Sequence, residues 1–281
     1  MIPKSHAVLL AAAALRIPSR RLRALALGKE EALRAWLGGE SAYRLAEARH
    51  NTNLALMRLE ELGARVISLG DPDYPAGLKD LPDPPPFLTA RGTLPEGGGI
   101  AIVGSRDAEA EPADFARRLA SLVAGPIVSG LARGIDAAAH EGALSSNTPT
   151  IAYVGNGLGA TYPPEHRELE ERIVAAGGAI LSERLPDEPV AKWALAKRDR
   201  LQAAHAGAVV LVQSDAAGGA MHTMRFARDL GRKRFALEPL RNLMVAYGGN
   251  VLALAEGATA LPWDADEACR LIAYSAVRSR A

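Results

Sequence analysis

The sequence predicts an α/β protein built on a doubly wound, mostly parallel sheet, with a small helical domain before it. Beyond residue 99, short apolar runs rich in Val and Ile alternate with longer amphipathic segments at helical spacing. This alternation is typical of a parallel sheet that helices cover on both faces. Residues 1–60 are rich in Ala, Leu and Arg, and their apolar residues recur at helical spacing without a strand-like run, which indicates a separate helical unit.

The first 62 residues are expected to form the small helical domain, of a SAM-like or helix-hairpin-helix-like type. A strand is expected at Ala64–Leu69, where the larger domain begins. The stretch from Asp71 to Pro95 carries seven of the chain's 18 prolines. Because proline fixes φ and donates no backbone hydrogen bond, we expect an ordered linker or an edge segment there rather than a helix.

Strands and helices are expected to alternate through the larger domain, which spans residues 63–265. The strands are predicted at residues 100–104, 126–129, 150–154, 179–182, 208–213 and 234–237, and the helices near 112–124, 135–144, 164–176, 190–205 and 219–231. Apolar strands joined by crossover helices in this way predict a Rossmann-like sheet. Residues 266–281 are expected to form a helical tail, with no winged helix after it.

The composition is typical of a soluble globular protein, with 48% hydrophobic residues, 23% charged residues and a mean hydropathy of 0.00. No apolar stretch reaches the ~18 residues of a membrane-spanning helix. The apolar run near the N-terminus breaks at Arg16, so we interpret it as a packed helix rather than a leader. The single cysteine, Cys269, excludes an intramolecular disulfide and a cysteine zinc site, and it favours the reducing cytoplasm.

Glycine, serine and arginine gather directly after the predicted strands, where a doubly wound sheet binds its ligands. Glycine lets the backbone approach a ligand closely, and a helix N-terminus adds partial positive charge, so such loops suit phosphate. The loops supply the candidate binding residues Gly104, Ser105, Arg106, Gly130, Arg133, Gly134, Gly218 and Gly219. The alternative interpretation of each loop is a tight turn between a strand and a helix. The alternative interpretation of Arg106 is a surface residue that forms a salt bridge to Asp107 or Glu109. Neither a dinucleotide fingerprint after the first strand nor a G-K-[ST] motif is present, so no nucleotide cofactor is expected.

With a net charge of +1, the chain needs a local concentration of basic residues to bind a polyanion. Nine basic residues against three acidic ones lie between Lys192 and Arg234. The helix expected at residues 190–205 carries the candidate contacts Lys192, Trp193, Lys197, Arg198 and Arg200. Lys197 and Arg200 are expected to share one helix face, and Trp193 offers a stacking surface for a base. A solvated basic face and a packing tryptophan are the alternative interpretations.

A catalytic role is the weaker interpretation of the acidic residues near the predicted strand ends. Asp136 and His140, four residues apart on one predicted helix, resemble an acid–base pair, and Glu183 resembles a general base. Asp136 is better explained by the favourable field of a helix N-terminus, and His140 by a local hydrogen bond. No catalytic residue and no metal site are therefore expected.

Two runs of residues closely resemble the DprA (Smf) family of DNA-processing proteins. One is Val103-Gly104-Ser105-Arg106, and the other extends from Ile127 to Leu144 and reads IVSGLARGIDAAAHEGAL. Shorter matches stand at Asp73-Tyr74-Pro75, Asp83-Pro84-Pro85-Pro86, Thr161-Tyr162-Pro163, Leu181-Ser182-Glu183, Gly231-Arg232 and Gly249-Asn250-Val251-Leu252. The resemblance covers the chain from about residue 64 to residue 261.

The resemblance implies a cytoplasmic protein that binds single-stranded DNA and is not an enzyme. It implies protection of incoming strands in natural transformation, displacement of single-strand-binding protein, loading of the RecA recombinase, and a homodimer without cofactor, metal or membrane partner. The implied phosphate contacts are Gly104, Ser105, Arg106, Gly218 and Gly219, and the implied groove residues are Lys192, Arg198 and Arg200.

The chain departs from the family pattern at two motifs. The usual F-x-x-R-N-R is here Leu195-Ala196-Lys197-Arg198-Asp199-Arg200, which replaces the aromatic residue with leucine and the asparagine with an acid. The usual S-G-[ST] is Ala217-Gly218-Gly219, without the hydroxyl before the helix. The alternative function is a LOG-like nucleotide phosphoribohydrolase or a nucleotide-sensing relative, although the acid of the P-G-G-x-G-T-x-x-E motif is missing after Gly218.

Overall fold

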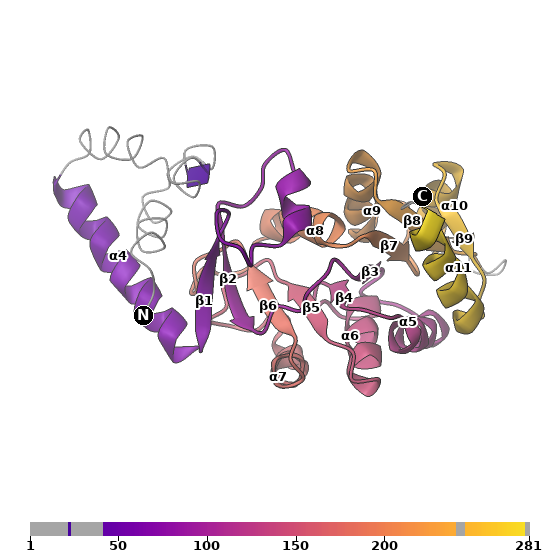
Figure 1. The fold of residues 1–281 in the computed structure, drawn as a ribbon, viewed down its shortest axis with the longest axis horizontal. Helices are drawn as coiled ribbons and strands as arrows, with labels where there is room; N and C mark the ends of the chain where they lie inside the picture. The colour runs from indigo at the N-terminus through magenta and orange to yellow at the C-terminus, as the bar shows by residue number, and fades with distance from the viewer. Residues whose placement is uncertain (1–21, 24–41, 240–244, 279–281) are drawn as a thin grey trace.

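The computed structural model describes residues 22–23, 42–239 and 245–278 (Figure 1). Within them, nine strands form one sheet in the order β1-β2-β6-β5-β4-β3-β7-β8-β9. The strands from β6 to β9 in this order are all parallel to their neighbours. Strand β2 continues the sheet from β6 in the antiparallel direction, and β1 pairs antiparallel with β2. The predicted α/β fold with a mostly parallel sheet is confirmed.

The elements follow the expected alternation. The strands are β1 (Ala64–Ser68), β2 (Phe87–Gly92), β3 (Ile100–Val103), β4 (Ile127–Ser129), β5 (Thr150–Tyr153), β6 (Ala179–Ser182), β7 (Ala208–Leu211), β8 (Lys233–Leu237) and β9 (Thr259–Leu261). The helices are α4 (Ala42–Glu61), η1 (Ala76–Asp80), α5 (Ala110–Leu122), α6 (Ile135–Ser145), η2 (Pro164–His166), α7 (Arg167–Ala175), α8 (Lys192–His205), α9 (Ala220–Asp229), α10 (Gly248–Ala255) and α11 (Ala265–Arg278). Several strands end one or two residues before their predicted limits, because the chain leaves the sheet there and enters the loops at its carboxyl edge.

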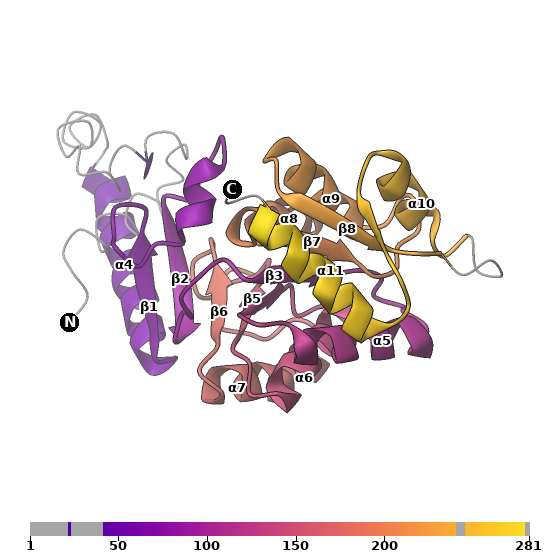
Figure 2. The same ribbon diagram turned by 45° about the vertical axis from the view of Figure 1, so that its right-hand side comes forward.

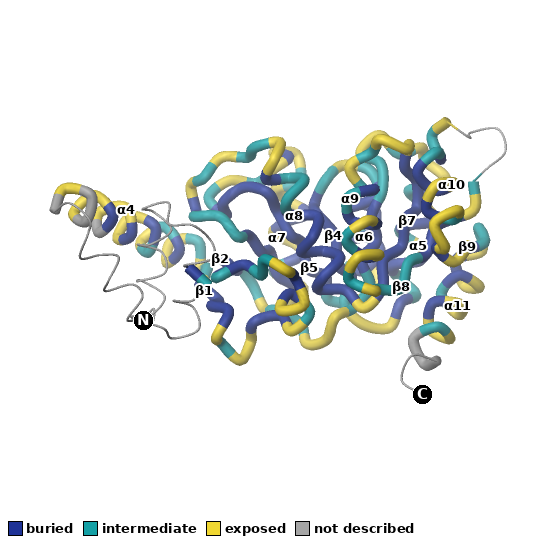
Figure 3. Tube along the Cα trace, turned by 90° about the horizontal axis from the view of Figure 1, so that it is seen from above, coloured by how far each residue is buried: buried dark blue, intermediate teal, exposed yellow. Residues whose placement is uncertain are grey.

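Helices cover both faces of the parallel sheet (Figures 1 and 2). Side chains from α8, α9 and α10 pack on one face with Ala101 and Val103 of β3, whereas α5, α6 and α11 pack on the other face with Ile102. This alternation along β3 is the period of two expected of a strand. The central strands are consequently buried between the two helical layers, as the dark core of Figure 3 shows.

The order of the strands creates a topological switch point. From β3 the chain passes through β4 and β5 to β6, then returns to the other side of β3 and continues through β7 and β8 to β9. Residue Ile100 of β3 pairs with Ile127 of β4 on one side and with Ala208 of β7 on the other. The loops after β3 and β7 therefore diverge and leave space between them at the carboxyl edge of the sheet.

The proline-rich segment differs from its prediction because it contains strand β2. This strand begins at Phe87, directly after Pro86, and lies between β1 and β6 rather than at an edge. Proline is tolerated just before a strand, and the residues that follow are free to pair on both sides. Strand β9 was not predicted, because its Thr259 and Ala260 are exposed and show no apolar alternation.

The structure describes only part of the predicted N-terminal helical domain and most of the predicted C-terminal tail. Most of the predicted helical domain at residues 1–62 lies outside the described residues, apart from α4 and residues 22–23. The expected tail is α11, whose Ala268 and Ile272 join the apolar cluster formed by α5. Among the described residues, no helix combines the length and apolar character needed to cross a bilayer.

Candidate functional site

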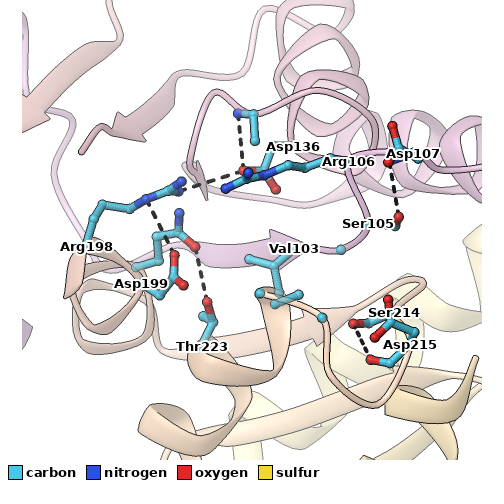
Figure 4. A pocket seen from close by; sticks show the side chains of 16 residues that line it. Val103, Ser105, Arg106, Asp107, Asp136, Arg198, Asp199, Ser214, Asp215 and Thr223 are labelled. Atoms are coloured by element: carbon cyan, nitrogen blue, oxygen red, sulfur yellow. Dashed lines mark hydrogen bonds and ion pairs between the residues drawn. The ribbon is translucent and has the colours of Figure 1, made fainter. Parts of the chain in front are cut away.

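A cavity of about 290 Å³ opens at the switch point between β3 and β7 (Figure 4). Five segments line it: the loop after β3, the loop after β4 with the start of α6, one side of α8, the loop after β7, and the start of α9. The lining residues include Gly104, Ser105, Arg106, Asp107, Asp136, Arg198, Asp199, Gln202, Ser214, Asp215, Gly218, Gly219 and Thr223. Its position is the one where open α/β sheets bind their ligands.

Tight backbone packing holds the loop after β3. A Cβ on Gly104 would lie 2.6 Å from Cγ1 of Ile135, so only glycine fits there. The Ser105 backbone N–H donates to the Gln213 carbonyl at 2.7 Å, and its carbonyl accepts from the Ile135 N–H at 3.1 Å. The Ser105 hydroxyl accepts from the Asp107 N–H at 3.2 Å. These bonds fix the loop and leave the Arg106 side chain exposed, without an ion pair to Asp107 or Glu109.

The loop after β4 is fixed by Asp136 from the first turn of α6. The Asp136 carboxylate accepts hydrogen bonds from the backbone N–H groups of Gly130 at 3.1 Å and Ala132 at 3.4 Å. Leu131 and Gly134 both have positive φ, at 59° and 70°. A Cβ on Gly134 would lie 2.2 Å from the Ser105 carbonyl, so this glycine allows the two loops to touch. Asp136 stands in the first turn of α6 as expected, but its carboxylate holds the loop before the helix and does not cap the helix.

Arg198 crosses from α8 to the loop after β4. Its Nη1 lies 3.8 Å from Oδ2 of Asp136, and its Nε lies 3.5 Å from Oδ1 of Asp199. A Cβ on Gly130 would lie 1.3 Å from the Arg198 Nη1, which means that the guanidinium occupies the space glycine leaves. The Arg198 side chain is only 5% exposed, so it is a buried cation between two buried carboxylates.

The charge of the cavity differs from the electropositive cradle that the glycine loops suggested. Four carboxylates line it against the two guanidinium groups of Arg106 and Arg198. Burial and the Asp136 charge raise the pKa of Asp199, the Arg198 charge lowers it, and the net result is a pKa of about 7. Burial also raises the pKa of Asp136. The interior therefore offers hydrogen-bond acceptors as well as positive charge.

A smaller apolar slot of about 20 Å³ adjoins the cavity and shares Arg106 and Arg198 with it. Gly130, Arg133, Gly155, Tyr162 and Leu195 also line this slot. Tyr162 is 38% exposed, and Arg133 is exposed with a distant ion pair to Glu165 at 3.8 Å. The carboxyl edge thus presents two exposed arginines beside an aromatic ring.

The other predicted residues of α8 lie away from the cavity. Lys197 and Arg200 share a face as expected, because both contact Glu183, at 3.3 Å and 2.6 Å. Arg200 does not line the groove as the resemblance implied, since two residues of helix turn it about 200° from Arg198. Trp193 is exposed, with the Arg184 guanidinium 5.0 Å from its ring centre, and Lys192 is exposed.

Sequence reasoning did not select several cavity residues. Asp199, Gln202, Ser214 and Thr223 line the cavity but were absent from the predicted site. Helical spacing could have identified two of them. Gln202 lies four residues after Arg198 and so shares a face of α8 with it, and Thr223 of α9 likewise lies four residues after Gly219.

His140 is a structural residue, and we expect it to stay neutral from pH 5 to pH 8. Its Nε2 accepts from the Leu131 N–H at 3.3 Å, and its Nδ1 lies 2.7 Å from the Thr150 hydroxyl, which donates to the Ile127 carbonyl at 2.9 Å. This series of hydrogen bonds places the proton of the neutral imidazole on Nδ1. Burial lowers the pKa of His140 to about 3. Nitrogen-15 NMR should show one unchanging neutral tautomer, and a titration near pH 6.5 would contradict this role.

Residues 65–272 match the family model described as DNA recombination-mediator protein A. The chain belongs to this family. Protein Smf of Synechocystis sp. is 32% identical over 242 residues, which cover 81% of this chain and 59% of that protein. DNA processing protein DprA of Bacillus subtilis is 31% identical over 219 residues, which cover 75% of this chain and 72% of that protein. The chain therefore spans less than two thirds of the Synechocystis relative, and the resemblance seen in the motifs is confirmed.

Two solved structures of the family share the fold. The structure of DprA from Streptococcus pneumoniae aligns with a TM-score of 0.73 at 25% identity and covers 93% of this chain and 95% of that one. DprA from Helicobacter pylori aligns with a TM-score of 0.62 at 27% identity and covers 75% of this chain and 96% of that one. The latter is described as having a distinctive mode of binding single-stranded DNA.

Proposed function

We propose that this protein binds single-stranded DNA along the carboxyl edge of its parallel sheet. The observation that carries the proposal is Arg106, which is exposed and lines both the cavity and the adjoining slot. A guanidinium in this position binds a phosphate between two neighbouring nucleotides through a charge-assisted hydrogen bond. Arg133 and Tyr162 extend the surface with a second cation and a stacking ring.

The wider role that we propose is supported by membership of the family. We propose that the protein acts in the cytoplasm as a homodimer, protects incoming strands during natural transformation, displaces single-strand-binding protein and loads RecA. We also propose that it does this without catalysis and without a cofactor. His140 and Glu183 support the non-enzymatic role, because the former is buried in a structural hydrogen-bond chain and the latter is ion-paired to Lys197 and Arg200.

The proposal predicts that the Arg106→Ala protein binds single strands about tenfold more weakly at low salt, since one charge-assisted contact is lost. Fluorescence polarisation with labelled single-stranded and duplex oligonucleotides at several salt concentrations measures this. The wild type should prefer the single strand, and its affinity should fall as salt rises. In the variant, the slope of log affinity against log salt should flatten by about 0.7.

Arg172→Ala is the matched control. Arg172 is an exposed arginine in the last turn of α7, which leads into the amino end of β6 and so lies at the opposite edge of the sheet. Its removal should leave affinity unchanged within twofold. Absence of single-strand binding by the wild type at low salt would refute the proposal, and release of adenine from AMP, followed by chromatography, would favour the phosphoribohydrolase instead.

A further inference from the structure

Asp199 places an unused hydrogen-bond acceptor in the cavity. The residue lines the cavity and is only 9% exposed, and Arg198 and Arg106 lie near it (Figure 4). Its ion pair with Arg198 has an N–O distance of 3.5 Å, and its carboxylate accepts no hydrogen bond from another described residue. A buried carboxylate without such donors is costly, so a ligand that supplies them gains affinity.

The surroundings of Asp199 favour a base over a phosphate. Asp107, Asp136 and Asp215 also line the cavity, so a phosphate placed inside would face four carboxylates. The neutral side chains of Gln202 and Thr223 add further hydrogen-bonding groups to the wall. A nucleobase carries no charge, fits a cavity of about 290 Å³, and presents N–H groups to carboxylate oxygens.

Guanine is the base whose edge best matches a carboxylate. Its Watson–Crick edge presents two parallel donors, N1–H and N2–H, that reach both oxygens of one carboxylate. Cytosine and adenine each offer a single amino group beside a ring acceptor, and thymine offers one N–H between two carbonyls that the carboxylate repels. Only guanine therefore forms a bidentate pair with an aspartate.

We propose that Asp199 makes this cavity a guanine-selective base site on the proposed single-stranded DNA surface. The inference rests on the proposed function and adds a sequence preference to it. An asparagine at this position would offer one acceptor and would set its NH₂ group against the donors of guanine. The acid in this chain is therefore the residue that sets the preference.

The pH dependence of binding provides an independent readout. Asp199 is faced by Arg198 on the same helix, by Asp136 from α6 and by Arg106 from the loop after β3, and its pKa is raised to about 7. The carboxylate is therefore largely protonated at pH 6 and ionised at pH 8. Because only the ionised form accepts from both guanine donors, the preference for guanine should be larger at pH 8.

The test compares thymidine oligonucleotides that carry a single central dG, dC or dA. Fluorescence polarisation at pH 8 should show the dG strand bound at least about fivefold more tightly than the other two, which is the lower limit for one bidentate pair. In Asp199→Asn the three strands should bind equally. Asp229→Asn, which removes an exposed carboxylate in the last turn of α9 outside the cavity, should keep the preference. Matched unfolding curves confirm that each variant is folded.

The outcomes separate this inference from the proposed function. If none of the strands binds, the proposed function fails. If all three strands bind the wild type equally, or if the preference persists in Asp199→Asn, the guanine site is refuted while single-strand binding stands. A preference that disappears in Asp199→Asn and grows from pH 6 to pH 8 in the wild type supports the site.

Discussion

Replacing Arg198 with methionine should destabilise the protein by about 3–5 kcal/mol at pH 8, as is typical when one partner of a buried ion pair is removed. The arginine lies between Asp136 and Asp199, and all three side chains are nearly buried. Without the cation, two ionised carboxylates face one another with no counter-charge. Urea unfolding of the variant and the wild type measures the difference.

The destabilisation caused by Arg198→Met should become smaller as the pH falls. Burial already raises the pKa of both carboxyl groups, and removal of Arg198 raises it further, so these groups take up protons in the folded variant on acidification. At pH 5.5 the variant should therefore recover part of the lost stability. Adding Asp136→Asn and Asp199→Asn should recover more of it at pH 8, because no buried charge then remains among the three residues.

Lys192→Met is the control for Arg198. This lysine also belongs to α8 but is exposed, so its replacement should change the free energy of unfolding by less than about 0.5 kcal/mol. Equal unfolding free energies for Arg198→Met and the wild type at pH 8 would contradict the assigned ion pairs.

Replacing Gly134 with alanine should cost about 3–5 kcal/mol in the free energy of unfolding and abolish DNA binding. The residue has φ 70° and ψ −122°, a conformation that side chains with a Cβ rarely adopt. The added methyl would also lie 2.2 Å from the Ser105 carbonyl and 2.8 Å from the Arg106 carbonyl. Backbone strain and overpacking each contribute about 1–3 kcal/mol, and the loop that carries Arg106 must move.

Gly219→Ala is the matched control for Gly134. Gly219 also lines the cavity, but its φ is −57° and a Cβ there meets no atom within 4 Å. Its replacement should leave stability unchanged or slightly raised. The two variants can be compared by thermal unfolding and by fluorescence polarisation with one oligonucleotide, and equal stability of both would refute the packing described between the two loops.

The sequence predicted the sheet well because β-rich apolar runs and amphipathic helices alternate regularly after residue 99. It also predicted that Gly104, Arg106 and Gly218 would meet at one edge, since the carboxyl ends of parallel strands lie together. What it did not predict is how α8 is rotated. Arg198 and Arg200 are both buried on different sides of that helix, so no apolar stripe marks the side facing the cavity.

The charge of the cavity was also beyond sequence reasoning. Asp136, Asp199 and Asp215 come from three distant segments, and only the fold brings them to the walls of one cavity. In the sequence, Asp199 stands out as a departure from a motif, whereas in the structure it is an acceptor inside the site. A count of basic residues between Lys192 and Arg234 therefore overestimated how positive this surface is.

The short final strand bears on how copies of this chain can associate. An exposed edge strand is a template for intermolecular β-pairing, and proteins suppress it by keeping such strands short. Strand β9 has three residues and ends the sheet on that side, so it offers too little free backbone for a sheet to continue stably into a second molecule. Self-association at this edge must depend on side-chain packing, which point substitutions can disrupt without unfolding the sheet.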